Sequence, residues 1–304
     1  MNMTHEAALA VELTDLRKTF RRAEAVHGLN LQIPAGCVFG LVGPNGAGKS
    51  TTIRMLMGLL RPDQGSVRVL GLDVIRQGVE LRQRVGYVPE THQIYRWMRV
   101  SEVLWFCRSH YRTWNESLCD ELLSLFQLDP RSKIRHLSKG AVGKLALLLA
   151  LVHEPELLVL DEPMSGLDPV AREDFLDGVL RTLCQRQQTV LFCTHLLDDI
   201  QRMADTVGIM LDGRLIVQRK TDELLATTKR IRATLRDGQQ PSRLPSGMLW
   251  QKVAGREWQV TIGDFTADKV AQLRAENPVE NVEVIDLGLE DVFKDIVRGQ
   301  RVAS

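Results

Sequence analysis

Gly43-Pro44-Asn45-Gly46-Ala47-Gly48-Lys49-Ser50 is the stretch that decides the fold of this chain. It matches G-x-x-x-x-G-K-[ST], with an apolar run at 38–42 before it and helical apolar spacing from 49 to 60 after it. A strand, a glycine-rich turn and a helix in this order form a phosphate-binding loop, because the glycines let backbone N–H groups converge on phosphate oxygens at the positive end of the helix. A glycine-rich turn that matched this motif by accident would not be expected to have both a strand before it and a helix after it. We therefore predict a nucleoside triphosphate site.

Two side chains of this loop have specific expected roles. Lys49 should reach the β- and γ-phosphates, and the Ser50 hydroxyl should ligate Mg²⁺. We place the remaining residues of the loop and Thr51 in the same nucleotide site.

A second apolar run ends in two acidic residues. Leu157-Leu158-Val159-Leu160 predicts a buried strand, and Asp161 and Glu162 follow it directly. Ligand sites in open α/β folds lie at the carboxyl ends of the strands, so Asp161 can hold Mg²⁺ through water and Glu162 can orient or deprotonate an attacking water. The alternative is a surface Asp-Glu pair, which is common in isolation but much less so downstream of a phosphate loop.

The next apolar strand, 189–193, ends in Thr194-His195. A neutral imidazole at that place can contact the γ-phosphate and sense whether it is present. A histidine after a strand is more often structural, but here it would follow the third strand end that converges on one nucleotide. We therefore group His195 with Glu162 and Lys49 as candidate catalytic residues.

Strands and helices alternate through most of residues 1–220, which is typical of a mostly parallel sheet covered by helices. Short strands are expected near 10–13, 29–33 and 67–70, a helical region at about 92–150, and a hairpin at 205–217. The chain is thus predicted to have an α/β fold in which helices cover a mostly parallel sheet.

The composition changes near Lys220, and residues 236–247 are rich in turn formers. Beyond them we expect strands at 258–262 and 282–285 and helices at 266–276 and 289–297. Residues 221–304 are therefore predicted to form a small appended α+β domain.

Composition also limits the function classes. A net charge of +1 offers no excess of cations to neutralise many phosphates, which argues against a nucleic-acid partner. The five cysteines are scattered and include no C-x-x-C pair, as expected of free thiols in a reducing compartment. Residues 1–11 hold no apolar stretch of signal length, and the longest apolar run has eight residues, where a bilayer needs about 20. We expect a soluble, cytoplasmic chain.

A further glycine-containing turn, Leu137-Ser138-Lys139-Gly140-Ala141, opens a helix about twenty residues before the acidic pair. With the phosphate loop, the acidic strand and His195 around it, this turn resembles the signature of the ATP-binding cassette (ABC) ATPases, the nucleotide-binding subunits of ABC transporters. The resemblance covers about residues 10–220, with the matched elements in the expected order. It implies an α/β P-loop NTPase fold with an antiparallel β subdomain and a helical subdomain.

The resemblance adds further expected site residues. Phe20 stands where these proteins stack an aromatic ring on adenine, and Glu90 stands at the position usually held by glutamine near Mg²⁺. Ser138 and Gly140 match the signature turn, and Ser165-Gly166-Leu167-Asp168 matches the loop that contacts a second subunit.

Several residues depart from the family pattern. Glu90 replaces glutamine, Lys139 replaces a glycine, Ala141 replaces a glutamine, and Met164 stands where Ser or Thr is usual. None of them removes a phosphate donor or the candidate base Glu162, so an active ATPase is expected.

The resemblance implies how the machine works. In this family the signature turn caps the nucleotide of a second subunit, so two ATP molecules with Mg²⁺ are sandwiched in a head-to-tail pair, and a homodimer is expected. The pair would act on a separately encoded permease, at the inner face of the cell membrane.

Three features are similar to those of ABC-2 type exporters: Pro89-Glu90, Lys139 and the stretch at 289–293. The stretch Tyr111-Arg112-Thr113-Trp114 is similar to the bacitracin- and lantibiotic-resistance branch.

Six aromatic residues between 95 and 114 fall where the family presents a groove to its permease: Tyr95, Trp97, Trp105, Phe106, Tyr111 and Trp114. A subdomain core is the better interpretation for about half of them.

The competing function is a cytosolic ABC ATPase of translation or DNA maintenance, but such proteins usually carry two cassettes or a long inserted coiled coil. A regulatory module without turnover is disfavoured by Glu162 and His195. The sequence does not name the cargo.

Overall fold

The computed structural model describes residues 8–21, 23–165, 167–186, 188–236 and 239–303. The chain divides into two compact units. One unit runs up to His195 and also includes Gly208–Val217; the other includes Leu196–Val207 and the described residues from Gln218 onward.

A six-stranded sheet with the order β10-β9-β3-β8-β7-β6 forms the centre of the first unit. The pairs β6–β7, β7–β8 and β8–β3 are parallel. Every residue of β7 and β8 is buried, as expected of strands covered on both faces. The strands are β3 (Val38–Val42), β6 (Val85–Val88), β7 (Leu157–Asp161), β8 (Thr189–Cys193), β9 (Thr206–Leu211) and β10 (Arg214–Lys220).

An antiparallel sheet with the order β2-β1-β4-β5 packs into the same unit. Its apolar side chains join one core cluster with helix α1 and the parallel strands; Leu13, Ile33, Ile53 and Leu157 are members. The antiparallel strands and α1 are β1 (Leu9–Phe20), β2 (Ala23–Pro34), β4 (Gln64–Val69), β5 (Leu72–Asp73) and α1 (Lys49–Leu56). Helix α1 is shorter than the apolar spacing predicted, because the chain turns at Gly58, whose φ of +65° is left-handed.

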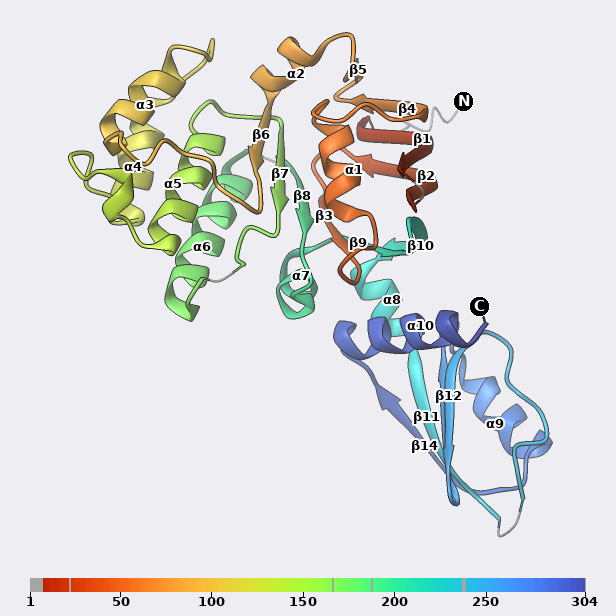
Figure 1. Cartoon of the computed structure of the whole chain (residues 1–304). Coiled ribbons are helices and arrows are strands. Elements are labelled where there is room, and N and C mark those ends of the chain that lie inside the picture. Colours follow the sequence, from red (N-terminus) through yellow and green to blue (C-terminus); the bar gives the residue numbers. More distant parts are fainter. Residues whose placement is uncertain (1–7, 22, 166, 187, 237–238, 304) are drawn as a thin grey trace, which may run out of the picture. The chain divides into compact units, whose positions relative to one another are not determined.

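The remaining helices of the first unit gather beside the β6 edge of the sheet (Figure 1). In α6, a Cβ on Gly178 would lie 2.5 Å from the Phe126 ring, so only glycine lets this ring pack so closely on the helix. The helices are α2 (Gly78–Arg84), α3 (Val100–Arg108), α4 (Glu116–Leu125), the 3₁₀ turn η1 (Ile134–His136), α5 (Lys139–Leu151) and α6 (Pro169–Arg186).

The second unit holds an antiparallel sheet with the order β12-β13-β11-β14. Alternate residues of β11 and β13 serve opposite faces, as strand geometry requires. Ile231, Trp258 and Val260 join the core that includes Leu273 of α9, whereas Arg230 and Thr261 bond Asp295 of α10. The elements are α7 (Leu197–Met203), α8 (Thr221–Thr227), β11 (Lys229–Leu235), β12 (Met248–Ala254), β13 (Glu257–Ile262), α9 (Ala267–Glu276), β14 (Val279–Asp286) and α10 (Leu289–Ala303).

Among the helices that the structure describes, none is both long and apolar enough to cross a membrane.

One ion pair ties α2 to the start of β7. Arg84 Nε and Nη2 donate to the two Glu156 carboxylate oxygens at 2.5 and 2.8 Å. These bonds lower the pKa of Glu156 below its ordinary value of 4.5. A carboxyl whose pKa is depressed by folding stabilises the fold above its unfolded pKa, and this stabilisation is lost as the pH falls through its folded pKa.

We therefore expect Glu156→Gln to lower the free energy of unfolding at pH 7 by up to about 1 kcal/mol, since both side chains are partly exposed. Urea titrations of both proteins at about pH 7 and about pH 3 measure this difference, which should shrink at the lower pH. An equal difference at both pH values would contradict the prediction.

Candidate functional site

The phosphate loop spans the end of β3 and the start of α1, as its flanks predicted. Gly48 has a φ of +97°, and a Cβ there would lie 2.4 Å from the Ala25 carbonyl oxygen, so glycine is required. Lys49 is buried and its Nζ donates to the carbonyl oxygens of Gly43 at 2.7 Å and Pro44 at 3.3 Å. The lysine is thus held across the loop, with its charge at the place where phosphates would arrive.

Asp161 ends β7 and lies beside the phosphate loop. Its Oδ1 accepts a hydrogen bond from Ser50 Oγ at 3.1 Å, so two residues 111 positions apart meet at one point. Burial raises the pKa of the Asp161 carboxyl; hydrogen bonds from Ser50 and Cys193 lower it, while the charges of Glu90 and Glu162 raise it further. A cation at this point would relieve that charge repulsion.

The donor set fits Mg²⁺. A hydroxyl and a carboxylate oxygen side by side are the hard ligands that this ion prefers, and Mg²⁺ is usually bound by one or two such groups together with substrate phosphates. Within the described residues no group of three His, Cys, Asp or Glu is arranged to hold a metal. Ser50 and Asp161 would therefore need phosphate oxygens to complete the coordination.

Both the backbone and the side chain of Glu162 are held in place. Its φ of +47° is left-handed, which is uncommon for a side chain other than glycine, and its N–H donates to the Cys193 carbonyl at 2.7 Å. Its buried carboxylate accepts hydrogen bonds at Oε2 from His195 Nδ1 at 2.8 Å and from Thr194 Oγ1 at 3.3 Å. The ends of β7 and β8 together orient this carboxylate.

His195 itself is exposed, with 55% of its side chain accessible. Since its Nδ1–H donates to Glu162, Nε2 is left facing away from the carboxylate and is free to meet a ligand. The sequence placed both residues at strand ends but did not predict that they are hydrogen-bonded to each other.

The phosphate loop, Glu162 and His195 border a cavity of about 530 Å³. Ala25 and Ser165 also line it; Ala25 comes from β2, and no sequence signal marked it as a site residue. The predicted nucleotide-site residues that line the cavity are Asn45, Gly46, Ala47, Gly48, Lys49, Ser50, Thr51, Glu90, Glu162 and His195.

Six predicted site residues are not among those that line this cavity: Phe20, Gly43, Pro44, Ser138, Gly140 and Asp161. Phe20 ends β1, 46% exposed, with Lys18 Nζ 5.7 Å from its ring centroid. Exposed Ser138 caps α5, its Oγ accepting the Ala141 N–H at 3.1 Å, whereas Gly140 is buried against Ala171. The signature turn therefore stands apart from the cavity of its own chain. Gly166 lies outside the described residues.

The chain was compared with known protein families. The ABC transporter family matches residues 26–165, which include the phosphate loop, the signature turn and the acidic pair.

Curated relatives match along most of the chain. An uncharacterized ABC transporter ATP-binding protein, YhaQ of Bacillus subtilis (strain 168), is 32% identical to this chain. The match covers 91% of this chain and 94% of that relative. The daunorubicin/doxorubicin resistance ATP-binding protein DrrA of Streptomyces peucetius is 33% identical. The match covers 93% of this chain and 86% of that relative. The bacitracin transport ATP-binding protein BcrA of Bacillus licheniformis is 32% identical. The match covers 70% of this chain and 71% of that relative.

A solved structure of an ATP-binding subunit of an ABC transporter superposes with a TM-score of 0.65 at 28% identity. The match covers 71% of this chain and 92% of that chain. The superposition confirms the α/β fold expected from the sequence.

Proposed function

This chain belongs to the ABC transporter ATP-binding proteins, and from that premise we propose that it hydrolyses ATP to power export of a substrate through a separately encoded membrane permease. The relatives named for drug resistance and bacitracin transport support export as the direction. We further propose residues 1–220 as the nucleotide-binding domain and 221–304 as an accessory domain, with the chain bound at the inner face of the cell membrane through its permease.

The observation that carries the proposal is the placement of Glu162. Its carboxylate borders the same cavity as the phosphate loop and is held there by His195 and Thr194. A carboxylate so placed can accept a proton from a water that attacks the γ-phosphate in line. His195 keeps it oriented through Nδ1 and can use Nε2 to sense the phosphate.

The other groups stabilise charge. Lys49 and the loop N–H groups would bind the β- and γ-phosphates, and Ser50 and Asp161 would hold Mg²⁺, with Glu90 beside them. When bound, Mg²⁺ neutralises charge that develops on the phosphate oxygens. Phe20 is proposed to stack on adenine, since its ring is exposed at the end of β1.

A second copy of the chain is proposed to complete the site. Ser138 and Gly140 stand apart from their own cavity, which supports their use on a nucleotide bound by a partner. ATP would then favour the closed pair, because the γ-phosphate contacts exist only in that state, and hydrolysis would reopen it.

The permease is proposed to dock on the aromatic surface of the helical subdomain. Four of its six rings are exposed, at fractions from 45% for Phe106 to 72% for Trp105, and such rings offer a large contact area at low entropy cost. Tyr111 and Trp114 are more buried, and Tyr111 stacks on His153 with ring centroids 4.0 Å apart. Tyr111 is therefore proposed to pack within the subdomain rather than to contact the permease.

The proposal is tested by purifying the chain with the membrane protein encoded beside it and measuring phosphate release from Mg-ATP. Turnover together with co-purification of a polytopic membrane protein supports the proposed function. Absence of turnover in both the isolated chain and the complex, or co-purification of ribosomes or DNA instead, would overturn it.

Lys139, which replaces a glycine of the family pattern, lies in the turn that is proposed to contact the partner's nucleotide in the closed pair. It is the exposed first residue of α5, where a cation adds to the positive end of the helix. We expect Lys139→Gly to leave ATP-dependent dimer affinity unchanged or to weaken it by up to about threefold. Sedimentation of the ATP-bound protein measures this, with Lys139→Gln separating the loss of charge from the helix penalty of glycine. A joint rise of turnover and dimer affinity would contradict the expectation.

A further inference from the structure

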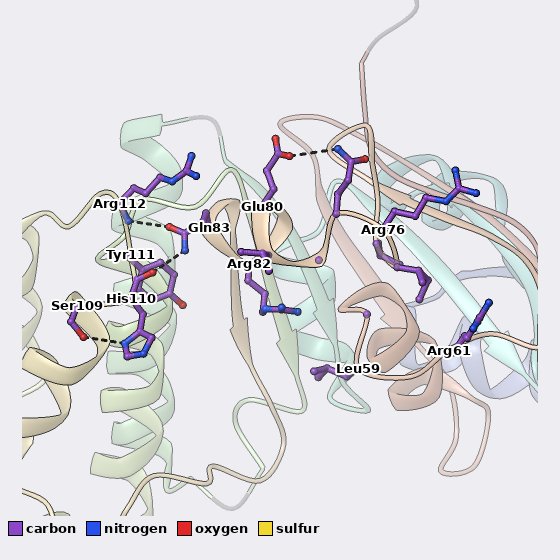
Figure 2. Close-up of a pocket in the computed structure, with 16 residues that line it drawn as sticks. Leu59, Arg61, Arg76, Glu80, Arg82, Gln83, Ser109, His110, Tyr111 and Arg112 are labelled. Carbon is purple, nitrogen blue, oxygen red and sulfur yellow. Dashed lines mark hydrogen bonds between the residues drawn. The ribbon is translucent and has the colours of Figure 1, made fainter.

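A hollow of about 520 Å³ lies wholly within the second unit. One wall is α10, and the other is formed by β11, β12 and β13. It shares no lining residue with the hollow of about 1160 Å³ beside α2, where Gln83 Nε2 donates to the His110 carbonyl and Gln83 Oε1 accepts the Arg112 N–H (Figure 2). We call the hollow of the second unit the α10 pocket. Its volume is within the range of about 300–1,000 Å³ that is typical of small-molecule sites.

Strand register determines which side chains form the sheet wall of the α10 pocket. Trp250, Thr261 and Arg230 are neighbours across β12, β13 and β11, so they lie in one row on the same face of the sheet. Two residues further along β12 and β13, Lys252 and Gln259 form the next pair on this face. The wall therefore combines an aromatic ring with two cations.

Asp295 anchors α10 to this face of the sheet. The residue is fully buried, and its Oδ2 accepts hydrogen bonds from Thr261 Oγ1 at 2.6 Å and from Arg230 Nη2 at 2.7 Å. Asp291, one turn earlier on α10, accepts a longer bond of 3.4 Å from the same Arg230 nitrogen. Two carboxylates thus balance the one guanidinium of Arg230, whose side chain is only 18% exposed.

Three further cations line the α10 pocket and are more exposed: Lys252 on β12, and Lys294 and Arg298 on α10. Among the residues that the structure describes, Lys252 has no ion-pair partner. Lys294 pairs with exposed Glu290 of its own helix at 2.6 Å, a kind of pair that contributes little and can be exchanged for a ligand. Arg298 Nη1 lies 3.8 Å from Asp295 Oδ1, which is beyond hydrogen-bond distance.

The charge that faces the pocket is therefore positive. Its lining has four cations and one carboxylate, Asp291. When the buried Asp295 and the surface Glu290 are also counted, the cations still exceed the carboxylates.

Trp250 holds the guanidinium of Arg298 beside the pocket. The Cζ atoms of Arg230 and Arg298 lie 5.8 and 5.6 Å from the centroid of the Trp250 ring, close enough for each cation to be attracted to it. A guanidinium also presents paired N–H donors that match the oxygens of a carboxylate or a phosphate. Arg298 is thus oriented by an aromatic ring while its donors stay accessible.

We propose that the α10 pocket binds a small molecule that carries at least two carboxylate or phosphate groups, through Lys252, Lys294 and Arg298. Two groups are required because the cations stand on both walls: Lys252 on the sheet, and Lys294 and Arg298 on the helix. Such a ligand would bridge β12 and α10. This site lies in the accessory domain and is additional to the proposed ATPase function.

Occupation of the α10 pocket would also affect α7. The Leu289 N–H, at the start of α10, donates to Gln201 Oε1 of α7 at 2.7 Å. Helix α7 begins at Leu197, two residues after His195. A ligand that holds α10 against the sheet therefore restrains the segment that leads to His195.

The test uses the full chain labelled with 5-fluorotryptophan, in which the Trp250 fluorine resonance is identified by its loss in Trp250→Phe. Citrate and pyrophosphate are titrated separately, without nucleotide or metal. At least one of them should shift the Trp250 resonance with a Kd below about 1 mM. Binding should weaken as NaCl rises from about 50 to about 500 mM, because salt screens exposed charges. The anion that binds more tightly shows whether carboxylate or phosphate groups are preferred.

The double variant Lys252→Gln/Arg298→Gln should weaken binding at least about 10-fold, since it removes one cation from each wall. The matched control Arg243→Gln/Arg274→Gln makes the same change of net charge at two exposed positions and should stay within about twofold. Arg274 lies on α9, which packs on the opposite face of the sheet. Thermal unfolding confirms that both variants are folded. Equal losses in the two variants, or no shift of the Trp250 resonance with either anion, would overturn the proposal.

Hydrogen exchange tests the link to α7. The tighter anion should slow amide exchange in α10 and α7 of the wild type. In Gln201→Ala it should still bind but protect α10 alone, because the hydrogen bond between the two helices is lost. Binding that leaves exchange in α7 of the wild type unchanged would overturn the link. Neither experiment contains a permease or a nucleotide, so a failure here is distinct from a failure of the proposed function.

Discussion

Glu162→Gln should slow ATP turnover by at least about 10²-fold while the protein still binds ATP. Glutamine keeps the size of the side chain and can still accept hydrogen bonds at its carbonyl oxygen, so the contacts to His195 Nδ1 and Thr194 Oγ1 can be retained. It cannot take a proton from water at neutral pH. The loss should therefore fall on the chemical step, with kcat reduced and ATP affinity nearly unchanged.

Single-turnover phosphate release and equilibrium binding of Mg-ATP separate these two effects. Because hydrolysis no longer removes the γ-phosphate, the variant should also accumulate an ATP-bound dimer. Glu223→Gln is the matched control, since it makes the same change at an exposed position on α8. Wild-type turnover in Glu162→Gln would exclude Glu162 as the base, and a loss of ATP affinity without a loss of kcat would assign it to binding instead.

Lys49→Ala should abolish measurable turnover and weaken ATP binding by at least about 100-fold. The Lys49 ammonium is the one side-chain cation of the phosphate loop, and its Nζ is pre-positioned by the Gly43 and Pro44 carbonyls. Each hydrogen bond to a charged group contributes about 1.5–3 kcal/mol, so the loss of contacts to two phosphates accounts for a change of this size.

Isothermal titration with Mg-ATP measures the affinity, and thermal unfolding shows whether the variant is folded. Lys49→Met retains the apolar stem of the buried side chain and should show the same loss, which separates the effect of the charge from a packing defect. Lys220→Met, at the exposed end of β10, is the control. ATP affinity within a few-fold of wild type in both Lys49 variants would show that this lysine does not hold phosphate.

The local patterns of the nucleotide-binding unit were strong enough to predict from sequence. β3, β7 and β8 are continuous apolar runs, and they occur where the sequence placed strands. Helices 266–276 and 289–297 correspond to α9 and α10, although α10 extends to Ala303. Periodicity is informative where one face of an element is consistently buried.

Other elements were missed. β11 and β12 were not predicted, although Ile231, Ala233 and Leu235 alternate with polar residues as in a half-buried strand. The helical stretch expected from 92 is in fact irregular until Val100, and the short helices α2, α7 and α8 were not predicted. Helices of seven residues are too short to show a reliable period and depend on tertiary packing.

The amino-acid sequence alone was enough to identify the family, the order of the matched elements and the residues at each strand end. These features depend only on the spacing of residues that are close together in the sequence. The packing of the strands and helices determines which of these residues meet, as Ser50 does with Asp161 and Glu162 with His195. Contacts between residues distant along the chain are set by how strands and helices pack, and the signature turn stands apart from its own cavity for the same reason. The residues that carry the chemistry were therefore predictable, whereas the hydrogen bond from His195 that orients Glu162 was not.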